Sequence, residues 1–496
     1  MYIVQIASEC APVIKAGGLG DVVYGLSREL EARGNTVELV LPMYDCMRYD
    51  HIWGIHIAYQ DLWVPWYDGK IHCTVYCGWV HGLLCFFIEP HSQDSFFNRG
   101  KVYGDSDDNM RFAFFSKAAL EFLQQSGKKP DVIHCHDWQT GLIPVLLYEV
   151  YQHHGMAYQR VCFTIHNFKH QGIAGAEMLA ATGLNNVEYY FDYSRLQDNF
   201  NPFALNFMKA GIVYSNYVTT VSPHHAWEAR FTEIGYGLGH TLELHQSKFS
   251  GVLNGIDYRV WNPEDDHYIP DSYTAENLKG KAENKKALRD RLLLQESDKA
   301  IVAFIGRLDE QKGVHLVRHA IHYTLQKEAQ FALLGSATEA SINDTFWHEK
   351  QYLNDNPDCH LELGFNEELS HLIYAGADMI IVPSNYEPCG LTQMIGMRYG
   401  TVPIVRGVGG LVSTVFDWDY DPDHPVEERN GFVFYQTDFR GLESAMERAI
   451  DLWKFAPDQF EALTSQGMNC DYSWKQSAET YSNIYEFIRH KGLARK

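Results

Sequence analysis

The sequence predicts an α/β protein with two doubly wound domains that face each other across a cleft. The chain has 496 residues, which is more than one ordinary hydrophobic core organises. In each half, short apolar runs alternate with helical stretches, a pattern typical of βαβ units and a parallel sheet. A segment rich in turn signals, residues 254–267, separates the two halves.

In the first half, apolar runs predict strands at residues 2–7, 36–41, 132–135, 161–165 and 217–221. Helices are expected at residues 21–33, 108–125 and 141–152. Residues 71–76 and 84–88 predict a hairpin that turns at His81-Gly82. This first domain is expected to span residues 1–256.

The second half repeats the alternation and is expected to form a domain over residues 257–474. Its strands are predicted at residues 301–305, 330–334, 360–363, 379–382 and 402–405. A charged helix is expected at residues 275–295. Residues 477–490 predict a final helix that packs through Tyr481, Tyr485 and Phe487 on one face.

The composition limits the possible partners and compartments. A formal net charge of −22 argues against a general nucleic-acid binder and against adhesion to anionic lipid, although an anionic small substrate stays compatible. Ten scattered cysteines form no Cys-x-x-Cys pair, which favours reduced thiols in a cytoplasmic protein. No run of about 18 apolar residues predicts a membrane span. The first strand begins at Tyr2, which leaves no room for a targeting peptide.

The most informative loop follows the apolar run 379–382 and reads Pro383-Ser384-Asn385-Tyr386-Glu387-Pro388-Cys389-Gly390-Leu391-Thr392-Gln393. A helix is expected directly after it, over residues 393–399. In open parallel sheets, ligands bind outside the carboxyl ends of strands, beside helix N-termini whose free N–H groups suit phosphates and hydroxyls. The Glu387 carboxylate would suit a sugar's hydroxyls or a developing positive charge.

Two other loops that join a strand to a helix carry cations. In residues 15–21, Lys-Ala-Gly-Gly-Leu-Gly-Asp, the glycines permit close approach to a phosphate and Lys15 adds a charge, although a tight structural turn is the alternative. In residues 306–313, Arg307 and Lys312 could converge on one diphosphate, the arginine as a planar fork and the lysine as a point charge. Two solvated surface charges are the alternative there.

Other strand ends are less specific. His166, in Thr164-Ile165-His166-Asn167, either donates to a sugar hydroxyl or is a packed, satisfied histidine. The role of Asn254 is equally undecided, because an Asn-Gly pair is first of all a turn signal. Residues 407–411, Gly-Val-Gly-Gly-Leu, suggest a backbone nest for an anion.

Two clusters look like metal sites, but neither is expected to bind a metal. Asp105, Asp107 and Asp108 lie just before a helix and are expected to cap it. Strand alternation places His134 and His136 on one face of the sheet and Asp137 on the other, without a suitably spaced fourth ligand.

With these motifs in this order, the chain resembles the bacterial glycogen synthase and plant starch synthase family. It is most similar to the cyanobacterial second-type glycogen synthases, which are similar to starch synthases III and IV. The matching strings are Lys15-x-Gly17-Gly18-Leu19-Gly20-Asp21, His136-Asp137-Trp138, Thr164-Ile165-His166-Asn167, Asn254-Gly255-Ile256-Asp257, Gly306-Arg307-Leu308 with Lys312-Gly313, and Glu387-Pro388-Cys389-Gly390-Leu391-Thr392-Gln393.

The resemblance implies two Rossmann-like domains of the GT-B kind, with residues 475–496 crossing back onto the first. It implies a retaining glucosyltransferase that moves glucose from ADP-glucose to the non-reducing end of an α-1,4-glucan such as glycogen, starch or a malto-oligosaccharide. No metal ion or other cofactor is implied. The sequence does not decide whether the donor is ADP-glucose or UDP-glucose.

The resemblance also assigns roles to residues. The donor phosphates are expected to contact Arg307, Lys312, Lys15 and the glycines Gly17 and Gly18, with Asp21 near the donor. The transferred sugar is expected to contact His166 and Glu387, assisted by backbone N–H groups around Cys389, Gly390 and Leu391. Tyr374 matches the aromatic that stacks on adenine, and Asn254 and Thr392 complete the expected donor-binding set.

The chain departs from the family pattern at two places. The later glycine run usually reads Thr-Gly-Gly-Leu-x-Asp, but here Val408 and Ser413 replace the threonine and the aspartate. Ile395 stands where many GT-B enzymes carry a second glutamate. A catalytically silent glucan-binding protein of the same fold is the alternative function. A dinucleotide-dependent oxidoreductase would need the glycine fingerprint that this chain lacks.

Overall fold

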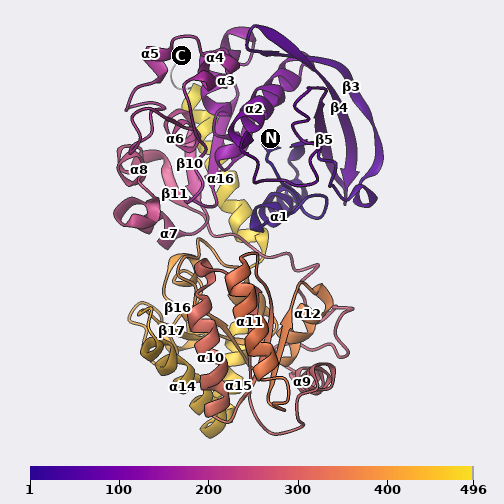
Figure 1. Cartoon of the computed structure of the whole chain (residues 1–496), viewed down its shortest axis with the longest axis vertical. Helices are drawn as coiled ribbons and strands as arrows, with labels where there is room; N and C mark the ends of the chain where they lie inside the picture. The colour runs from indigo at the N-terminus through magenta and orange to yellow at the C-terminus, as the bar shows by residue number, and fades with distance from the viewer. Residues whose placement is uncertain (494–496) are drawn as a thin grey trace. The chain divides into compact units, whose positions relative to one another are not determined.

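The computed structural model describes the backbone of residues 1–493 and the side chains up to residue 490. The chain divides into two compact units. The N-terminal unit contains Met1–Gly255 together with the chain from Trp474 onward, and the C-terminal unit contains Ile256–Ser473. Both units are doubly wound α/β structures (Figure 1), so the predicted fold class is confirmed.

The N-terminal unit is built on a nine-stranded sheet in the order β11-β10-β7-β6-β1-β2-β5-β4-β3. Its strands are β1 (Tyr2–Ile6), β2 (Thr36–Pro42), β3 (Trp53–Trp66), β4 (Gly69–Val80), β5 (Leu83–Pro90), β6 (Val132–His136), β7 (Arg160–Ile165), β10 (Tyr217–Thr220) and β11 (Phe249–Gly251). The strands from β11 to β5 pair in parallel, and β4 and β3 add an antiparallel edge. The predicted strands and the turn at His81-Gly82 are confirmed.

The helices and smaller elements of this unit cover the sheet. They are α1 (Gly18–Ala32), α2 (Asp108–Gln125), α3 (Ile143–Glu149), α4 (Glu177–Thr182), α5 (Val187–Tyr190), α6 (Phe207–Tyr214), α7 (Pro223–Phe231), α8 (Gly239–Leu244), α16 (Trp474–Leu493) and the short ribbon β8 (Ile173–Ala174) with β9 (Leu205–Asn206). The helix predicted at 141–152 is present as α3 but is shorter, and a separate 3-10 turn follows it at Tyr151–His154. Proline fits only the first turn of a helix, so α3 starts at Ile143 with Pro144, and it ends before Val150.

The last helix, α16, packs beside α1 within this unit (Figure 1). Trp474 lies against Gly25, where an added Cβ would approach the indole nitrogen to 2.1 Å. Tyr481 and Tyr485 are fully buried, as predicted. Phe487 is not, since 47% of it is exposed. The helical period places Ile484 and Ile488, rather than Phe487, on the buried face.

The C-terminal unit has a six-stranded parallel sheet in the order β14-β13-β12-β15-β16-β17. Its strands are β12 (Ile301–Arg307), β13 (Gln330–Ser336), β14 (Cys359–Leu363), β15 (Met379–Val382), β16 (Val402–Arg406) and β17 (Phe432–Phe434). Its helices are α9 (Lys279–Leu292), α10 (Val314–Gln326), α11 (Ala340–Tyr352), α12 (Glu367–Gly376), α13 (Thr392–Arg398), α14 (Phe439–Phe455) and α15 (Pro457–Asn469).

Alternate residues of β12 enter two different cores in the C-terminal unit. Val302 and Phe304 pack into the core shared with α10 and α14, whereas Ile301 and Ala303 pack with α9 and α12. This explains why the strand is apolar on both faces, as the continuous apolar run predicts.

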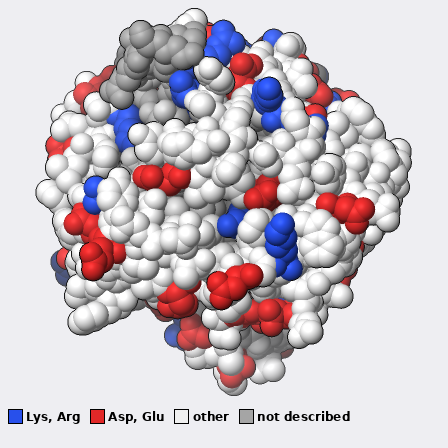
Figure 2. Space-filling view, turned by 90° about the horizontal axis from the view of Figure 1, so that it is seen from above, with Lys and Arg blue, Asp and Glu red and all other residues white. Residues whose placement is uncertain are grey.

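Within residues 1–493, no helix has the length and apolar content needed to cross a membrane. On the face of the molecule shown in Figure 2, Lys and Arg side chains are interspersed with Asp and Glu and do not gather into one large basic patch. This distribution agrees with the acidic net charge of the sequence.

Candidate active site

The strand order reverses between β12 and β15 of the C-terminal unit, and ligands bind at such switch points. The Arg307–Lys312 loop follows β12 and the Glu387 loop follows β15. Asn385 joins the two loops: its backbone N–H donates to Gln311 O at 2.8 Å and its Nδ2 donates to Glu310 O at 2.8 Å. The two loops are therefore joined directly by hydrogen bonds.

Lys312 and Glu387 form an ion pair at the meeting point of these loops. Lys312 Nζ lies 2.5 Å from Glu387 Oε2, and the Oγ of Ser384 donates to the same oxygen at 2.8 Å. Only 8% of the Glu387 side chain and 20% of the Lys312 side chain are exposed. The structure thus brings together a predicted phosphate-binding cation and the predicted sugar-binding carboxylate.

Arg307 is the more accessible cation, with 61% of its side chain exposed. Its Nη1 pairs with Asp309 Oδ2 at 3.1 Å. Exposed ion pairs of this kind are typically worth about 1 kcal/mol or less, so an incoming phosphate can replace the carboxylate at little cost.

The helix expected at 393–399 is α13, which begins at Thr392 after Leu391 and has no side-chain cap. The turn before it requires a glycine at Gly390, where φ is +76°. The buried Gln393 supports this turn. Its Nε2 donates to Cys389 O at 3.2 Å, to Gly390 O at 2.9 Å and to Thr414 Oγ1 at 3.0 Å.

The glycine run 407–411 does not form the expected anion nest. The N–H of Gly410 donates to Glu387 O at 3.0 Å. A Cβ on Gly409 would lie 1.9 Å from Glu387 O, and one on Gly410 would lie 2.0 Å from Cys389 O. These glycines instead let a second backbone support the Glu387 loop from behind, which a side chain would prevent.

Tyr374 is buried, with 3% of its surface exposed. Its ring meets Trp261 edge to face at 5.5 Å, and Lys281 Nζ donates to carbonyls at the end of its helix, including Ala375 O at 3.1 Å. These contacts hold the ring against Trp261.

In the N-terminal unit the strand order reverses between β1 and β6, and the Lys15 loop follows β1. Lys15 Nζ pairs with Asp21 Oδ2 at 2.8 Å, so these two predicted residues lie together. An added Cβ at Gly17 or Gly18 would meet no protein atom within 4 Å. Packing within the protein therefore does not require glycine at either position, whereas close approach of a ligand would.

His166 lies at the end of β7, beside the end of β6. Its backbone N–H donates to Asp137 Oδ1 at 2.7 Å, and its Nε2 lies 3.0 Å from His136 Nδ1. Burial lowers the pKa of His166 to about 3 and raises the pKa of Asp137 to about 7. A neutral imidazole has one donor and one acceptor nitrogen, so it can contact a sugar hydroxyl without adding a positive charge.

Asn254 lies just after β11, and only 6% of it is exposed. Among the described residues, its Oδ1 has no hydrogen-bond partner although it is buried. Buried acceptors are almost always satisfied in native proteins, so this atom is free to accept from a ligand.

Comparison with known proteins identifies the group to which the chain belongs. Residues 2–244 match the family described as "Starch synthase catalytic domain", and residues 285–462 match "Glycosyl transferases group 1". "Glycogen synthase 1" from Synechococcus sp. (strain JA-2-3B'a(2-13)) is 74% identical over 99% of this chain and 100% of that protein. The chain belongs to the glycogen synthase family.

Other members of the glycogen synthase family agree with this. "Glycogen synthase 2" from Methylococcus capsulatus is 60% identical over 98% of this chain and 100% of its own length. The solved catalytic domain of starch synthase IV from Arabidopsis thaliana, bound to ADP and acarbose, is 45% identical, covers 99% of both chains and superposes with a TM-score of 0.94. The fold is therefore GT-B, and the protein is a glycosyltransferase.

Glu9 supports the Lys15 loop, and sequence reasoning missed it. It is 2% exposed, and its Oε2 accepts from the N–H groups of Ala16 at 2.5 Å and Gly17 at 3.0 Å. Tyr103 OH donates to its other oxygen at 2.5 Å. The N–H groups of Ala16 and Gly17 are therefore already occupied. The first turn of α1 has no side-chain cap, so its N–H groups are available to a ligand. The only signal in the sequence was an acidic residue between β1 and the glycine loop.

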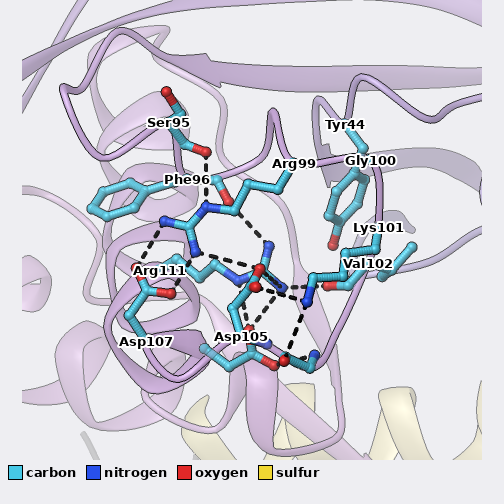
Figure 3. A network of polar contacts seen from close by, with 12 residues as sticks. Tyr44, Ser95, Phe96, Arg99, Gly100, Lys101, Val102, Asp105, Asp107 and Arg111 are labelled. Carbon is cyan, nitrogen blue, oxygen red and sulfur yellow. Dashed lines mark hydrogen bonds and ion pairs between the residues drawn. The ribbon is translucent and has the colours of Figure 1, made fainter.

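The three aspartates at the start of α2 do not cap this helix as expected. Asp105 and Asp107 lie beside Arg99, Lys101 and Arg111 (Figure 3). Asp107 occupies the N-cap position but makes no capping hydrogen bond. Its carboxylate binds Arg99 through two contacts, Nη1 at 2.5 Å and Nη2 at 2.8 Å. A charged, bidentate guanidinium is a stronger partner for a carboxylate than a helix N–H. This explains why Asp107 binds Arg99 instead of capping α2.

Asp108 and Asp105 are also paired with cations. The fully buried Arg111 donates from Nε to Asp108 Oδ1 at 2.9 Å, and Lys101 Nζ lies 2.8 Å from Asp105 Oδ1. The three carboxylates are close enough to bind one metal ion. The basic side chains around them (Figure 3) already neutralise this charge, so the cluster is a structural network within the N-terminal unit.

Proposed function

We propose that the protein transfers glucose from ADP-glucose to the non-reducing end of an α-1,4-glucan, with retention of configuration. The observation that carries this proposal is the Lys312–Glu387 pair, held by Ser384 and by two interlocked loops at the switch point of a GT-B unit. Within the family the substrate class follows from the relatives, one of which was solved with ADP and the oligosaccharide acarbose.

In the proposed reaction, Lys312 and Arg307 stabilise the departing diphosphate. Glucosyl transfer passes through an oxocarbenium-like state, with positive charge on the sugar and negative charge on the leaving group. Lys312 contacts Glu387 through one of its three donors, so others are available for a phosphate oxygen. Preorganised charges of this kind act where charge develops and need not reorganise during the reaction.

Glu387 and His166 are the proposed sugar contacts. Glu387 Oε2 is occupied by Lys312 and Ser384, which leaves Oε1 for a sugar hydroxyl. The neutral His166 provides a second contact, and the N–H groups after Gly390 assist. Lys15, Asp21, Gly17, Gly18, Asn254, Tyr374, Cys389, Leu391 and Thr392 complete the proposed donor-binding set.

We propose no covalent enzyme intermediate and no metal ion in this reaction. The donor phosphate would take the proton of the acceptor hydroxyl on the face where it leaves. The proposed partners are ADP-glucose and an α-1,4-glucan, without nucleic acid or membrane. The ten free cysteines, most of them buried, support a reducing, cytoplasmic location.

The test is direct. The purified chain is incubated with ADP-[14C]glucose and glycogen, with UDP-glucose as the competing donor, and label in precipitated glucan is counted. We expect incorporation that excess unlabelled ADP-glucose suppresses more strongly than UDP-glucose. Glucan binding without incorporation would instead identify a catalytically silent glucan-binding protein.

A further inference from the structure

A chain of buried polar side chains lies directly behind His166. His166 Nε2 lies 3.0 Å from His136 Nδ1, and His136 Nε2 lies 2.7 Å from Gln5 Oε1. Gln5 and His136 are fully buried. They come from the neighbouring strands β1 and β6, which place them next to each other although they are 131 residues apart in sequence.

The chemistry of each partner fixes the direction of these hydrogen bonds. An amide oxygen only accepts, so His136 Nε2 must carry the hydrogen that bonds to Gln5. A neutral imidazole has one donor and one acceptor, so His136 Nδ1 accepts. His166 Nε2 must then donate to it, and His166 Nδ1 is left as a lone-pair acceptor.

The histidines are neutral, as this argument requires. Burial lowers the pKa of His136 well below its ordinary value and that of His166 to about 3. Neither imidazole therefore carries the second proton that would make both nitrogens donors at neutral pH.

The Gln5 side chain is oriented with its amide oxygen toward His136. Its Nε2 is buried and has no hydrogen-bond partner among the described residues. The Tyr485 oxygen lies 2.7 Å from His134 Nδ1, and His134 Nε2 lies 2.6 Å from Thr164 Oγ1. The contact that orients His136 is therefore the one with the Gln5 oxygen.

We propose that Gln5 and His136 are positioning residues that fix the tautomer of His166, so that its Nδ1 accepts a hydrogen bond from a hydroxyl of the transferred glucose. The inference rests on the proposed glucosyl transfer. A lone pair at this position attracts a hydroxyl and repels a phosphate oxygen, so it distinguishes the sugar end of the donor from the diphosphate end.

Two pairs of variants test this. Gln5→Met keeps the size of the side chain and removes the acceptor, so His166 should become a mixture of tautomers. His136→Asn keeps an acceptor near the position of Nδ1, whereas His136→Leu removes it. We expect kcat to fall about tenfold in Gln5→Met and His136→Leu, the cost of roughly one neutral hydrogen bond, with KM nearly unchanged. His136→Asn should keep most of kcat.

The tautomer is read independently of turnover, from long-range 1H–15N correlations of [15N]histidine-labelled protein. The His166 signals are assigned with His166→Gln. We expect the Nε2–H form in the parent and in His136→Asn, and a mixture in Gln5→Met.

An Nδ1–H form in the parent, or an unchanged tautomer and kcat in Gln5→Met, would overturn the inference. If Gln5→Met does not fold, the two His136 variants decide. A parent without transferase activity would refute the proposed function but still give the tautomer.

Discussion

Lys312 Nζ and Glu387 Oε2 lie 2.5 Å apart. The two residues follow different strands and are 75 positions apart in sequence, yet they meet because Asn385 joins the two loops, while Ser384 positions the Glu387 carboxylate within its own loop. A cation and an anion are thus poised side by side before the reaction produces its own pair of opposite charges.

Removing either member of this pair should slow transfer strongly. We expect Lys312→Ala and Glu387→Gln each to lower kcat about 100- to 1,000-fold, as is typical for a preorganised charge. The double variant should lose much less than the product of the two effects, because the residues act as a unit. Initial rates with ADP-glucose and glycogen measure this.

A matched control is available on the surface of the same unit. Lys327 and Glu447 also form a lysine–glutamate ion pair, but away from the switch-point loops. Lys327→Ala and Glu447→Gln should leave kcat within about twofold, since exposed pairs contribute little. Near-normal turnover in Lys312→Ala or Glu387→Gln would remove that residue from the mechanism.

Ser384 should tune the carboxylate without being essential. Its Oγ donates one of the two contacts to Glu387 Oε2. We expect Ser384→Ala to lower kcat about tenfold, the effect of one hydrogen bond to a charged group, with little change in Tm. Ser341, which bonds Glu339 at 2.7 Å on the surface, provides the control: Ser341→Ala should not alter kcat. Equal rates for Ser384→Ala and the parent would show that Ser384 does not position Glu387.

Much of this arrangement could be predicted from the sequence. The central strands are buried on both faces, so β12 and β15 could be predicted from their continuous apolar runs. The charged loops that follow these two strands were then the natural candidates for the site. The edge strand β3 was missed because its exposed residues break any alternation. Ser384 stands three residues before Glu387 and was within reach of the same reasoning.

The supporting residues of the N-terminal unit could not be predicted in this way. Glu9 meets Tyr103 across 94 positions, and Gln5 meets His136 across 131. Such contacts depend on which strands become neighbours, and periodicity along one strand carries no information about that. The failed capping prediction has a related cause: Arg99 and Arg111 compete for the aspartates only once the loop has folded around them.

Gly409 should be intolerant of any side chain. Its φ is +53°, and an added Cβ would lie 1.9 Å from Glu387 O. We expect Gly409→Ala to displace the Glu387 loop, lowering Tm by several degrees and abolishing activity. Gly127 separates the effect of a positive φ from that of a steric clash. Its φ is +71°, but no atom lies within 4 Å of its Cβ position. Gly127→Ala should cost only about 1 kcal/mol of backbone strain. Similar Tm values for the two variants would mean that the contact with Glu387 is unimportant.

The aspartate cluster before α2 should not depend on a metal ion. Contacts with Lys101 and Arg99 hold the pKa of the Asp105 carboxyl below its usual range, so the charge is already balanced. We expect EDTA or added Ca2+ to leave Tm unchanged, while Arg99→Gln lowers it and makes it rise with Ca2+. A Ca2+-dependent Tm in the parent would instead identify a metal site at these carboxylates.

Stability should fall as the pH is lowered below neutrality. Burial lowers the folded-state pKa of His134 and His166 to about 3 and that of His136 well below its ordinary value. In the unfolded chain these groups take up protons near pH 6.5. Their stabilising effect is therefore complete above about pH 6.5 and is lost progressively as the pH falls toward about 3.

Asp137 acts in the opposite sense, because burial raises its pKa to about 7 and the folded state then binds the extra proton. These three histidines and Asp137 together contribute a net uptake of about two protons on unfolding, or about 2.7 kcal/mol per pH unit between pH 6 and 4; His245, whose pKa is lowered to about 4, adds to this slope. Urea unfolding at several pH values measures this slope. His134→Gln should reduce it by about 1.4 kcal/mol per pH unit, and replacing the exposed His154 by glutamine is the control. A slope that His134→Gln leaves unchanged would mean that His134 takes up a proton in the folded state, and the neutral network behind His166 would then be wrong.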